Sequence, residues 1–184
     1  MQYVKISLAG DLGSGKSTVG KILAKALDAE CYSTGTIQRQ IAEQMGMTTL
    51  ELNKYSETHP EIDFKIDDGL KALNQVNKNL IIDSRMAWHF VPSAFAVYLQ
   101  VEPMLAAKRI LADGRMVEKF SSVEEAMQSI LHRRESEILR YKTLYQVDIQ
   151  NLENYSYAID TSNLTPDAVA EKILIALKAW QNRQ

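Results

Sequence analysis

Apolar residues occur in two patterns that alternate along the chain. Short continuous runs predict strands, and apolar residues at helical spacing predict helices. The expected strands are 3–8, 30–32, 80–82, 95–101 and 155–159. The expected helices, with apolar residues at helical spacing, are 17–27, 36–45, a short one from 48, 59–73, 103–112, 122–145 and 166–177. Strands that alternate with helices indicate an α/β protein with a central parallel sheet covered on both faces, a three-layer α/β/α architecture.

Three of these helices carry recognisable N-terminal signals. Thr48 with Glu51 and Ser122 with Glu125 have the spacing of a capping box. The pair 165–166, Thr followed by Pro, places a cap before a proline in the first turn. These signals fix where the short helix, the longest helix and the last helix should begin.

The loop after the first strand fits the pattern G-x-x-x-x-G-K-S at every specified position. Strand, glycine-rich loop and helix form the arrangement in which backbone N–H groups converge on an anion. Lys16 is expected to reach the β- and γ-phosphates, and the Ser17 hydroxyl to ligate Mg²⁺. The residues expected to contact phosphate are Gly10, Gly13, Ser14, Gly15, Lys16, Ser17 and Thr18. The chain is therefore predicted to be a P-loop NTPase that binds ATP.

Polar residues also follow two later strands. Asp83 and Arg85 come directly after the strand at 80–82, and Asp160 and Thr161 end the strand at 155–159. Ligands bind at the carboxyl ends of parallel strands, so these residues are candidates for the cleft that holds Lys16. Asp83 resembles a Walker B aspartate that holds Mg²⁺ or contacts the acceptor; the alternative is that it caps a loop.

The longest helix carries an arginine on its apolar stripe. Arg134 falls in line with apolar residues, so its charge needs a partner. The partner is either a carboxylate (Glu135, Glu137 or Asp148) or the phosphates of a bound nucleotide. Arg109 and Arg115 lie around the break at 113–114, and arginines on a glycine hinge suit a lid that closes over phosphates.

Two further arginines, Arg39 and Arg85, lie after the second and third strands. Both are candidates for bidentate contact with a second anion, the phosphate of an acceptor. For Arg39 taken alone, a solvated surface position is the competing interpretation.

Composition narrows the class of protein. A chain of 184 residues suits one domain, and a net charge of −2 argues against a broad surface for nucleic acid or membrane. No apolar run has the length of a membrane span. Cys31 is the only cysteine, so no intrachain disulfide can form, which suits the cytoplasm. We expect a monomer, with an oligomer left open.

Many ordered segments resemble the cytidylate kinases, particularly the compact archaeal type, and they cover nearly the whole chain. The P-loop at 10–17 resembles that family's G-x-x-G-S-G-K-S, and 83–88 its E-G-R-L-A-G-W. Other matching segments are 33–39 (S-S-G-D-I-F-R), 46–51 (G-M-S-L-E-E), 59–63 (D-P-E-I-D), 134–145 (R-E-E-S-E-x-x-R-Y-x-x-I-Y), 147–149 and 159–162.

The resemblance implies a nucleoside-monophosphate kinase fold in one domain, 1–184, with an acceptor-binding helical part near 36–78 and a lid near 112–135. It implies Mg²⁺ with ATP as donor, and CMP or dCMP as acceptor. The site residues that it implies are Arg39 and Arg85 on the acceptor phosphate, Arg134 and Arg140 across the transferring phosphates, Asp160 and Thr161 near the adenine, and Asp63 on the cytosine amino group, with Thr36 and Asp83 on the acceptor side.

The chain departs from the family pattern at several of these positions. Thr36 replaces a frequent aspartate, Ser84 and Gln146 replace glycines, and 11–12, Asp-Leu, replaces a proline-rich start of the loop. Two alternatives remain open: a kinase of the same fold with another small acceptor, and a nucleotide-dependent switch or binding module. Against the switch, residues 77–80 lack the aspartate of a guanine-reading N-K-x-D.

Overall fold

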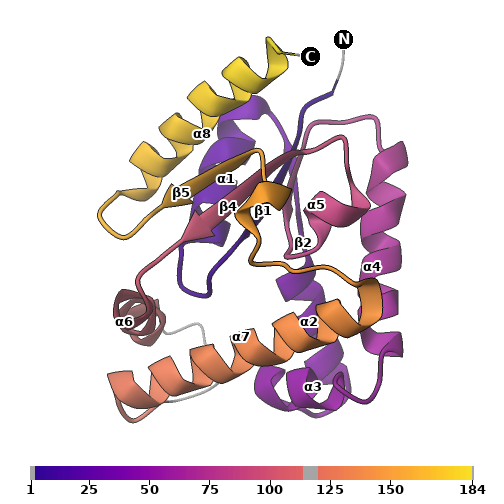
Figure 1. The fold of residues 1–184 in the computed structure, drawn as a ribbon, viewed down its shortest axis with the longest axis vertical. Coiled ribbons are helices and arrows are strands. Elements are labelled where there is room, and N and C mark those ends of the chain that lie inside the picture. The colour runs from indigo at the N-terminus through magenta and orange to yellow at the C-terminus, as the bar shows by residue number, and fades with distance from the viewer. Residues whose placement is uncertain (1–2, 114–119, 184) are drawn as a thin grey trace.

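The computed structural model describes residues 3–113 and 120–183, in which five parallel strands form one sheet in the order β2-β3-β1-β4-β5 (Figure 1). The strands are β1 (Lys5–Gly10), β2 (Glu30–Ser33), β3 (Leu80–Asp83), β4 (Phe95–Gln100) and β5 (Tyr157–Asp160). The predicted parallel sheet is confirmed, and each strand begins and ends within two residues of its prediction. The order places β1, and with it the P-loop, at the centre of the sheet.

Helices connect the strands, and the expected ones are all present. They are α1 (Lys16–Leu27), α2 (Thr34–Gln44), α3 (Thr49–Tyr55), α4 (Glu61–Ala72), α6 (Pro103–Asp113), α7 (Val123–Tyr145) and α8 (Pro166–Gln181). The pattern did not predict α5 (Ala87–Phe90) or the 3₁₀ turns at Leu73–Gln75 and Leu152–Asn154, which are too short to show a period. Within the described residues, no helix combines the length and apolarity that a membrane span needs.

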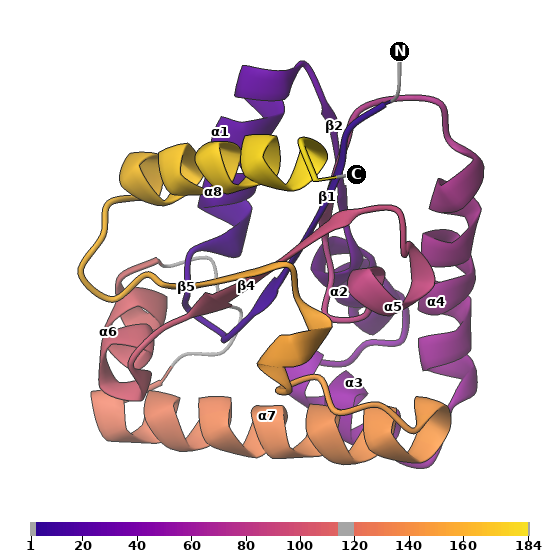
Figure 2. The ribbon, with the colours of Figure 1, turned by 45° about the horizontal axis from the view of Figure 1, so that its top comes forward.

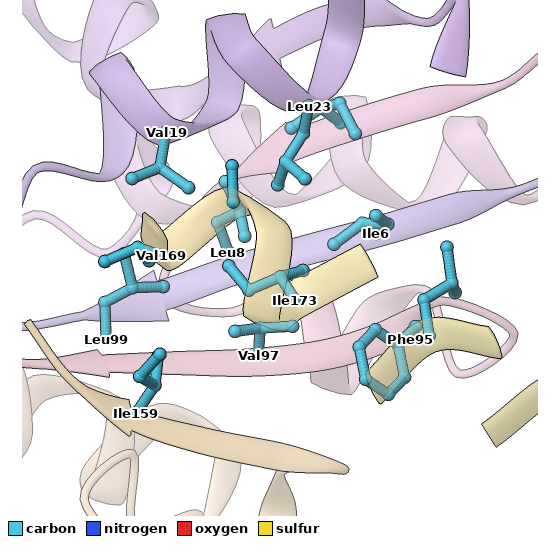
Figure 3. Close-up of a cluster of buried hydrophobic side chains, with 13 residues drawn as sticks. Ile6, Leu8, Val19, Leu23, Phe95, Val97, Leu99, Ile159, Val169 and Ile173 are labelled. Atoms are coloured by element: carbon cyan, nitrogen blue, oxygen red, sulfur yellow. The ribbon is translucent and has the colours of Figure 1, made fainter. Parts of the chain in front are cut away.

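Alternation along the strands divides the side chains between two faces of the sheet. Ile6 and Leu8 of β1 point toward α1 and α8, where Val97 of β4 and Ile173 of α8 join them (Figure 3). Ala9, the residue after Leu8, belongs to the opposite face. The helix-covered core beneath α1 and α8 therefore holds the strand that carries the P-loop.

The opposite face packs against α4, α5 and the C-terminal part of α7. Leu80 and Ile82 of β3 lie in a buried cluster with Leu70 of α4, Ala87 of α5 and Tyr141 of α7. In Figure 2 the long α7 runs along the side of the molecule away from α8, past both α6 and α3. This helix thus reaches from the segment after β4 to the helices between β2 and β3.

The two predicted capping boxes differ in detail. Thr48 and Glu51 form both reciprocal bonds at the start of α3. At the start of α7, the Ser122 hydroxyl accepts from the Glu125 backbone N–H, but the Glu125 carboxylate accepts from Ser121 rather than Ser122. The second prediction is therefore right about where the helix begins and wrong about one partner of Glu125.

Strand register brings the predicted site residues together. Asp83 lies opposite both Leu8 of β1 and Ser33 of β2, and Asp160 lies opposite Gln100 of β4. Because all strands run in the same direction, the loops after them meet at one edge of the sheet. The P-loop after β1 is at the centre of that edge.

Candidate active site

The P-loop adopts a backbone conformation that requires glycine at three places. Gly13 has a φ of 76°, and a Cβ on it would lie 2.8 Å from the Ala106 carbonyl oxygen of α6. Gly15, with a φ of 87°, immediately precedes α1, and no side chain caps that helix. Gly10 ends β1, and a Cβ there would clash with Leu99. The first-turn N–H groups of α1 are therefore left to face an anion.

Lys16 turns back over the loop. Its ammonium donates to the carbonyl oxygens of Gly10 at 3.0 Å and Asp11 at 2.6 Å. Burial and the neighbouring Arg85 lower the pKa of Lys16 to about 8, although Asp83 opposes that shift. Burial makes the charged form of Lys16 unfavourable in the free protein, so a bound phosphate should stabilise that charged form strongly.

Ser17 and Asp83 meet at the mouth of the P-loop. The Ser17 hydroxyl donates to the Asp83 carboxylate at 3.1 Å, and the Thr34 hydroxyl donates to the Asp83 carbonyl oxygen at 3.4 Å. A hydroxyl beside a carboxylate supplies the hard oxygen donors that Mg²⁺ prefers, and Mg²⁺ takes its other ligands from water and phosphate. The residues fit such an ion.

A cleft of about 810 Å³ opens over the P-loop. Its walls include the P-loop residues from Gly13 to Thr18, Asp83, Thr161 and five positively charged residues, which are Lys16, Arg39, Arg85, Arg109 and Arg133. So dense a concentration of positive charge matches a ligand that carries several phosphates. One site thus contains residues from the P-loop, the end of β3 and α7. The sequence predicted that the P-loop and the end of β3 would meet in this way.

A buried carboxylate holds two of these arginines. Glu137 of α7 accepts from Arg85 and, at 3.2 Å, from Arg133, while its side chain is only 4% exposed. Burial alone would favour the neutral acid, but Arg85 and Arg133 hold the pKa of Glu137 below its ordinary value. Glu137 therefore stays ionised and fixes both guanidinium groups at the wall of the cleft.

The sequence interpretation missed Arg133 and Glu137 as site residues. The pattern of apolar residues pointed to Arg134 rather than to Arg133, and it gave Glu137 only as one possible partner for Arg134. The signal that was present is their spacing of four residues, which places them on the same side of α7.

Arg109 joins the P-loop to the loop after β5. Its guanidinium donates to the carbonyl oxygens of Thr161 at 2.9 Å, Ser162 at 3.2 Å and Gly13 at 3.5 Å. The Thr161 hydroxyl donates to the carbonyl oxygen of Ser14 at 3.2 Å. Asp160, by contrast, accepts from Ser162 at the surface. The predicted contacts of Arg109, Asp160 and Thr161 with nucleotide stay predictions.

Arg39, which also lines the cleft, is exposed on α2. Its guanidinium donates to the Thr36 hydroxyl at 3.0 Å, so this threonine provides an acceptor where the family has a frequent aspartate. Ser84, a second departure, is buried and accepts from the Met86 backbone N–H. Neither departure removes a positive charge from the cleft.

Arg134 does not line this cleft. It forms an ion pair with Asp11 at 3.1 Å and borders a separate cavity of about 40 Å³. A contact between Arg134 and phosphate would require it to leave Asp11, and that role stays a prediction. The hinge at Gly114 and the neighbouring Arg115 lie outside the described residues.

Arg140 and Asp63 form a buried ion pair at 2.7 Å between α7 and α4. Arg140 also donates to the side-chain and main-chain oxygens of Asn53 in α3, at 2.9 and 3.1 Å. Both charged residues are at most 5% exposed and neither lines the large cleft. Their predicted contacts with phosphate and cytosine stay predictions, and both residues lie among the helices between β2 and β3.

Comparison with known proteins agrees with this geometry. Residues 6–139 match the AAA_18 family, described as an AAA domain. A cytidylate kinase of Thermoplasma volcanium is 34% identical over 175 residues, which cover 93% of this chain and 90% of that protein. The shikimate kinase of Bacteroides thetaiotaomicron has the same fold, with a TM-score of 0.66, 17% identity, and coverage of 95% of this chain and 98% of that one.

A further relative is longer. An S-adenosylmethionine-dependent nucleotide dehydratase of Lacinutrix mariniflava is 37% identical over 171 residues, which cover 92% of this chain but 35% of that protein. The chain thus spans about a third of that relative and nearly the full length of the archaeal ones. With a P-loop, a cluster of arginines and this degree of identity, the chain belongs to the cytidylate kinase family of nucleoside-monophosphate kinases.

Proposed function

We propose that the protein transfers the γ-phosphoryl group of ATP to CMP or dCMP, forming ADP and the cytidine diphosphate. The observation that carries this proposal is the distribution of charge in the cleft. Lys16 of the P-loop, Arg39 of α2, Arg85 after β3 and Arg133 of α7 all line this one cleft. Positive side chains from four different elements are more than one phosphate group needs, so we infer that two phosphate-bearing substrates bind there together.

On the donor side, the P-loop N–H groups and Lys16 bind the β- and γ-phosphates. Lys16 exchanges its two carbonyl partners, on Gly10 and Asp11, for phosphate oxygens that carry full charge. Thr161 and Arg109 position the loop after β5, where we place the adenine. ATP is the donor that the family implies.

On the acceptor side, Arg39 and Arg85 bind the phosphate of the nucleoside monophosphate. Thr36 orients Arg39, and Glu137 orients Arg85. For the base, we keep Asp63 as the proposed contact, because cytosine presents an amino donor that a carboxylate accepts. Arg140 stays our proposed contact of the transferring phosphates. The contact with the base requires α3 and α4 to move, since Asp63 and Arg140 pair with each other here.

For the transfer itself, positioning and electrostatics provide most of the catalysis, because the transferring group spreads its charge over three oxygens. Of the two neighbouring arginines on α7, Arg133 borders the cleft. It is our candidate for the residue that stabilises the negative charge on the transferring group. Residues 112–135 act as the lid that excludes water. An arginine in this role contributes about 10³- to 10⁵-fold in rate.

Ser17 and, directly or through water, Asp83 would hold Mg²⁺, which would supply positive charge against the donor phosphates. Asp83→Asn keeps the size of the side chain and removes its charge. It should raise the Mg²⁺ concentration needed for half-maximal activity, while leaving the thermal unfolding temperature without Mg²⁺ close to that of the wild type. An unchanged Mg²⁺ requirement would remove Asp83 from the metal site.

We also propose that the protein works as a monomer in the cytoplasm. The single cysteine, Cys31, permits no intrachain disulfide, which suits a reducing compartment. Light scattering during size-exclusion chromatography should give a mass near 20.8 kDa. A stable dimer mass would overturn the monomer.

The acceptor is tested by measuring ADP release from Mg²⁺ and ATP with CMP, dCMP, UMP, AMP, GMP and non-nucleotide acceptors. CMP or dCMP should give the highest kcat/KM, and Lys16→Ala should remove the activity while leaving the fold intact. Preference for another acceptor would keep the donor site and overturn the cytidine assignment. ATP binding without any turnover would favour a nucleotide-dependent switch.

The longer relative suggests a second proposal, that the product of this kinase is consumed by a separate nucleotide-modifying enzyme. The observation that favours it is the similarity to a segment of a protein named a nucleotide dehydratase. Purified dehydratase of that kind should consume S-adenosylmethionine faster with CMP, ATP and this protein than with CMP and ATP alone. Equal consumption would remove the proposal.

A further inference from the structure

The second residue of the P-loop, Asp11, is fixed from several directions. Its carboxylate accepts from the Tyr98 hydroxyl at 3.0 Å, from the Val101 backbone N–H at 3.0 Å and from Arg134 at 3.1 Å. Its own backbone N–H donates to Leu99 at 2.9 Å. These partners belong to β4, to the residue that follows it and to α7, so the side chain has little freedom.

The main-chain carbonyl of the same residue contacts the functional groups of the loop. It accepts from the Lys16 ammonium at 2.6 Å and from the Ser14 hydroxyl at 2.8 Å. Any rotation of the Asp11 peptide would therefore move the resting position of Lys16. The carboxylate of Asp11 contacts β4 and α7, and its main-chain carbonyl contacts Lys16. Asp11 thus links the sheet to the lysine that we expect to bind phosphate.

Arg134 is joined to the P-loop by its ion pair with this carboxylate. Its neighbour Arg133 borders the cleft, whereas Arg134 borders the adjoining small cavity with Asp11 and Tyr98. Successive residues on a helix point about 100° apart, which places the two arginines at different surfaces in this arrangement.

We propose that Asp11 is a positioning residue for Lys16, and that Arg134 acts on phosphoryl transfer through Asp11 rather than by touching phosphate. The ion pair makes the orientation of the P-loop depend on the position of α7, the helix whose other arginine borders the cleft. Asp11 stands where the family has the proline-rich start of the loop, so this coupling is a property of this chain.

Asp11→Asn tests this role directly. The asparagine keeps an acceptor for Tyr98 or Val101 but removes the charge that pairs with Arg134.

The first experiment measures the affinity of a non-hydrolysable ATP analogue by calorimetric titration. Asp11→Asn should lower the affinity about tenfold, because Lys16 loses its fixed resting position. Arg134→Gln frees the same carboxylate and should lower the affinity in the same direction. An unchanged affinity in Asp11→Asn would overturn the positioning role.

The second experiment is a double-mutant cycle on kcat/KM for transfer. Asp11→Asn and Arg134→Gln should each lower it about tenfold, and the double variant should lower it about tenfold as well, because the two residues act as a unit. Arg133→Gln is the matched control. When it is combined with Asp11→Asn, the fold losses of the two single variants in kcat/KM should multiply, as they do for independent residues. Losses that multiply for Asp11 and Arg134 would return Arg134 to direct contact with phosphate.

Rescue provides a third arm. Arg134→Lys can keep the ion pair with Asp11 and should retain most of the activity that Arg134→Gln loses, whereas an arginine that grips phosphate by two N–H groups would not be replaced so easily. The transfer assays rest on the proposed function, but analogue binding does not. A failure to phosphorylate CMP would therefore leave the analogue-binding experiment on Asp11 intact.

Discussion

Arg85 and Glu137, which are 52 residues apart in the chain, form an ion pair between the end of β3 and the middle of α7. Arg85 is 15% exposed at the side chain and Glu137 only 4%. Because Arg133 contacts the same carboxylate, one buried charge sets the direction of two guanidinium groups. One wall of the cleft is thus built across two elements that are remote in sequence.

Glu137→Gln is expected to release both arginines. The variant should lower kcat/KM for transfer about 10²-fold, because groups displaced by an ångström no longer match the transferring phosphate. It should also lower the free energy of unfolding by about 1–3 kcal/mol, since buried donors lose a charged acceptor. Steady-state kinetics and urea unfolding measure the two effects.

The control for that variant is Glu135→Gln, which removes an exposed carboxylate from the same helix. It should change neither quantity by a comparable amount. If Glu135→Gln and Glu137→Gln behaved alike, the ion pairs of Glu137 would have no special role in the site.

Lys16 should make nucleotide affinity depend on pH. Its pKa is about 8 in the free protein, and bound phosphates must raise it because they favour the protonated form. Affinity for an ATP analogue should therefore be highest below pH 8 and decline above it. Lys16→Arg, whose guanidinium keeps its proton over this range, should show no such decline in calorimetric titrations. A wild-type affinity that is flat to pH 9.5 would contradict the role of Lys16 charge.

Asp67 on α4 should make stability depend on pH. It is 3% exposed, and burial raises its pKa to about 6, although the Tyr145 hydroxyl donates to it. Because the folded pKa lies above the unfolded one, its contribution to stability is complete below about pH 4 and is lost as pH rises through 6. Asp67→Asn should gain up to about 3 kcal/mol relative to the wild type between pH 4 and 8.

Denaturant unfolding at a series of pH values checks the Asp67 prediction. Asp68→Asn is the matched control, because Asp68 is the next residue on α4 and its side chain is 72% exposed. A difference between Asp67→Asn and the wild type that stays constant with pH would show that the Asp67 carboxyl titrates normally.

Gln146 should be replaceable by glycine with a gain in stability. It follows the last turn of α7 in the left-handed conformation, with a φ of 58°, a position that glycine occupies without a steric cost. Gln146→Gly should raise the free energy of unfolding by about 0.5–1 kcal/mol. Calorimetric melting measures it, and Gln146→Ala should bring no such gain.

The sequence by itself determined the donor site and the layers of the fold. Motifs such as the P-loop at 10–17 are local: their glycines, Lys16 and Ser17 lie within one strand-loop-helix unit, so spacing alone indicates their arrangement. Alternation of strands with helices likewise determined the parallel sheet, because only a sheet covered on both faces buries such strands.

Only the tertiary structure decided which charges reach the cleft. The sequence pointed to Arg134, yet its neighbour Arg133 borders the cleft, because the contacts of α7 with the sheet set the rotation of that helix. Asp63 pairs with Arg140 through the packing of α4 against α7. A side chain on a long helix can face several partners, and the partner that it meets depends on residues far away in the chain.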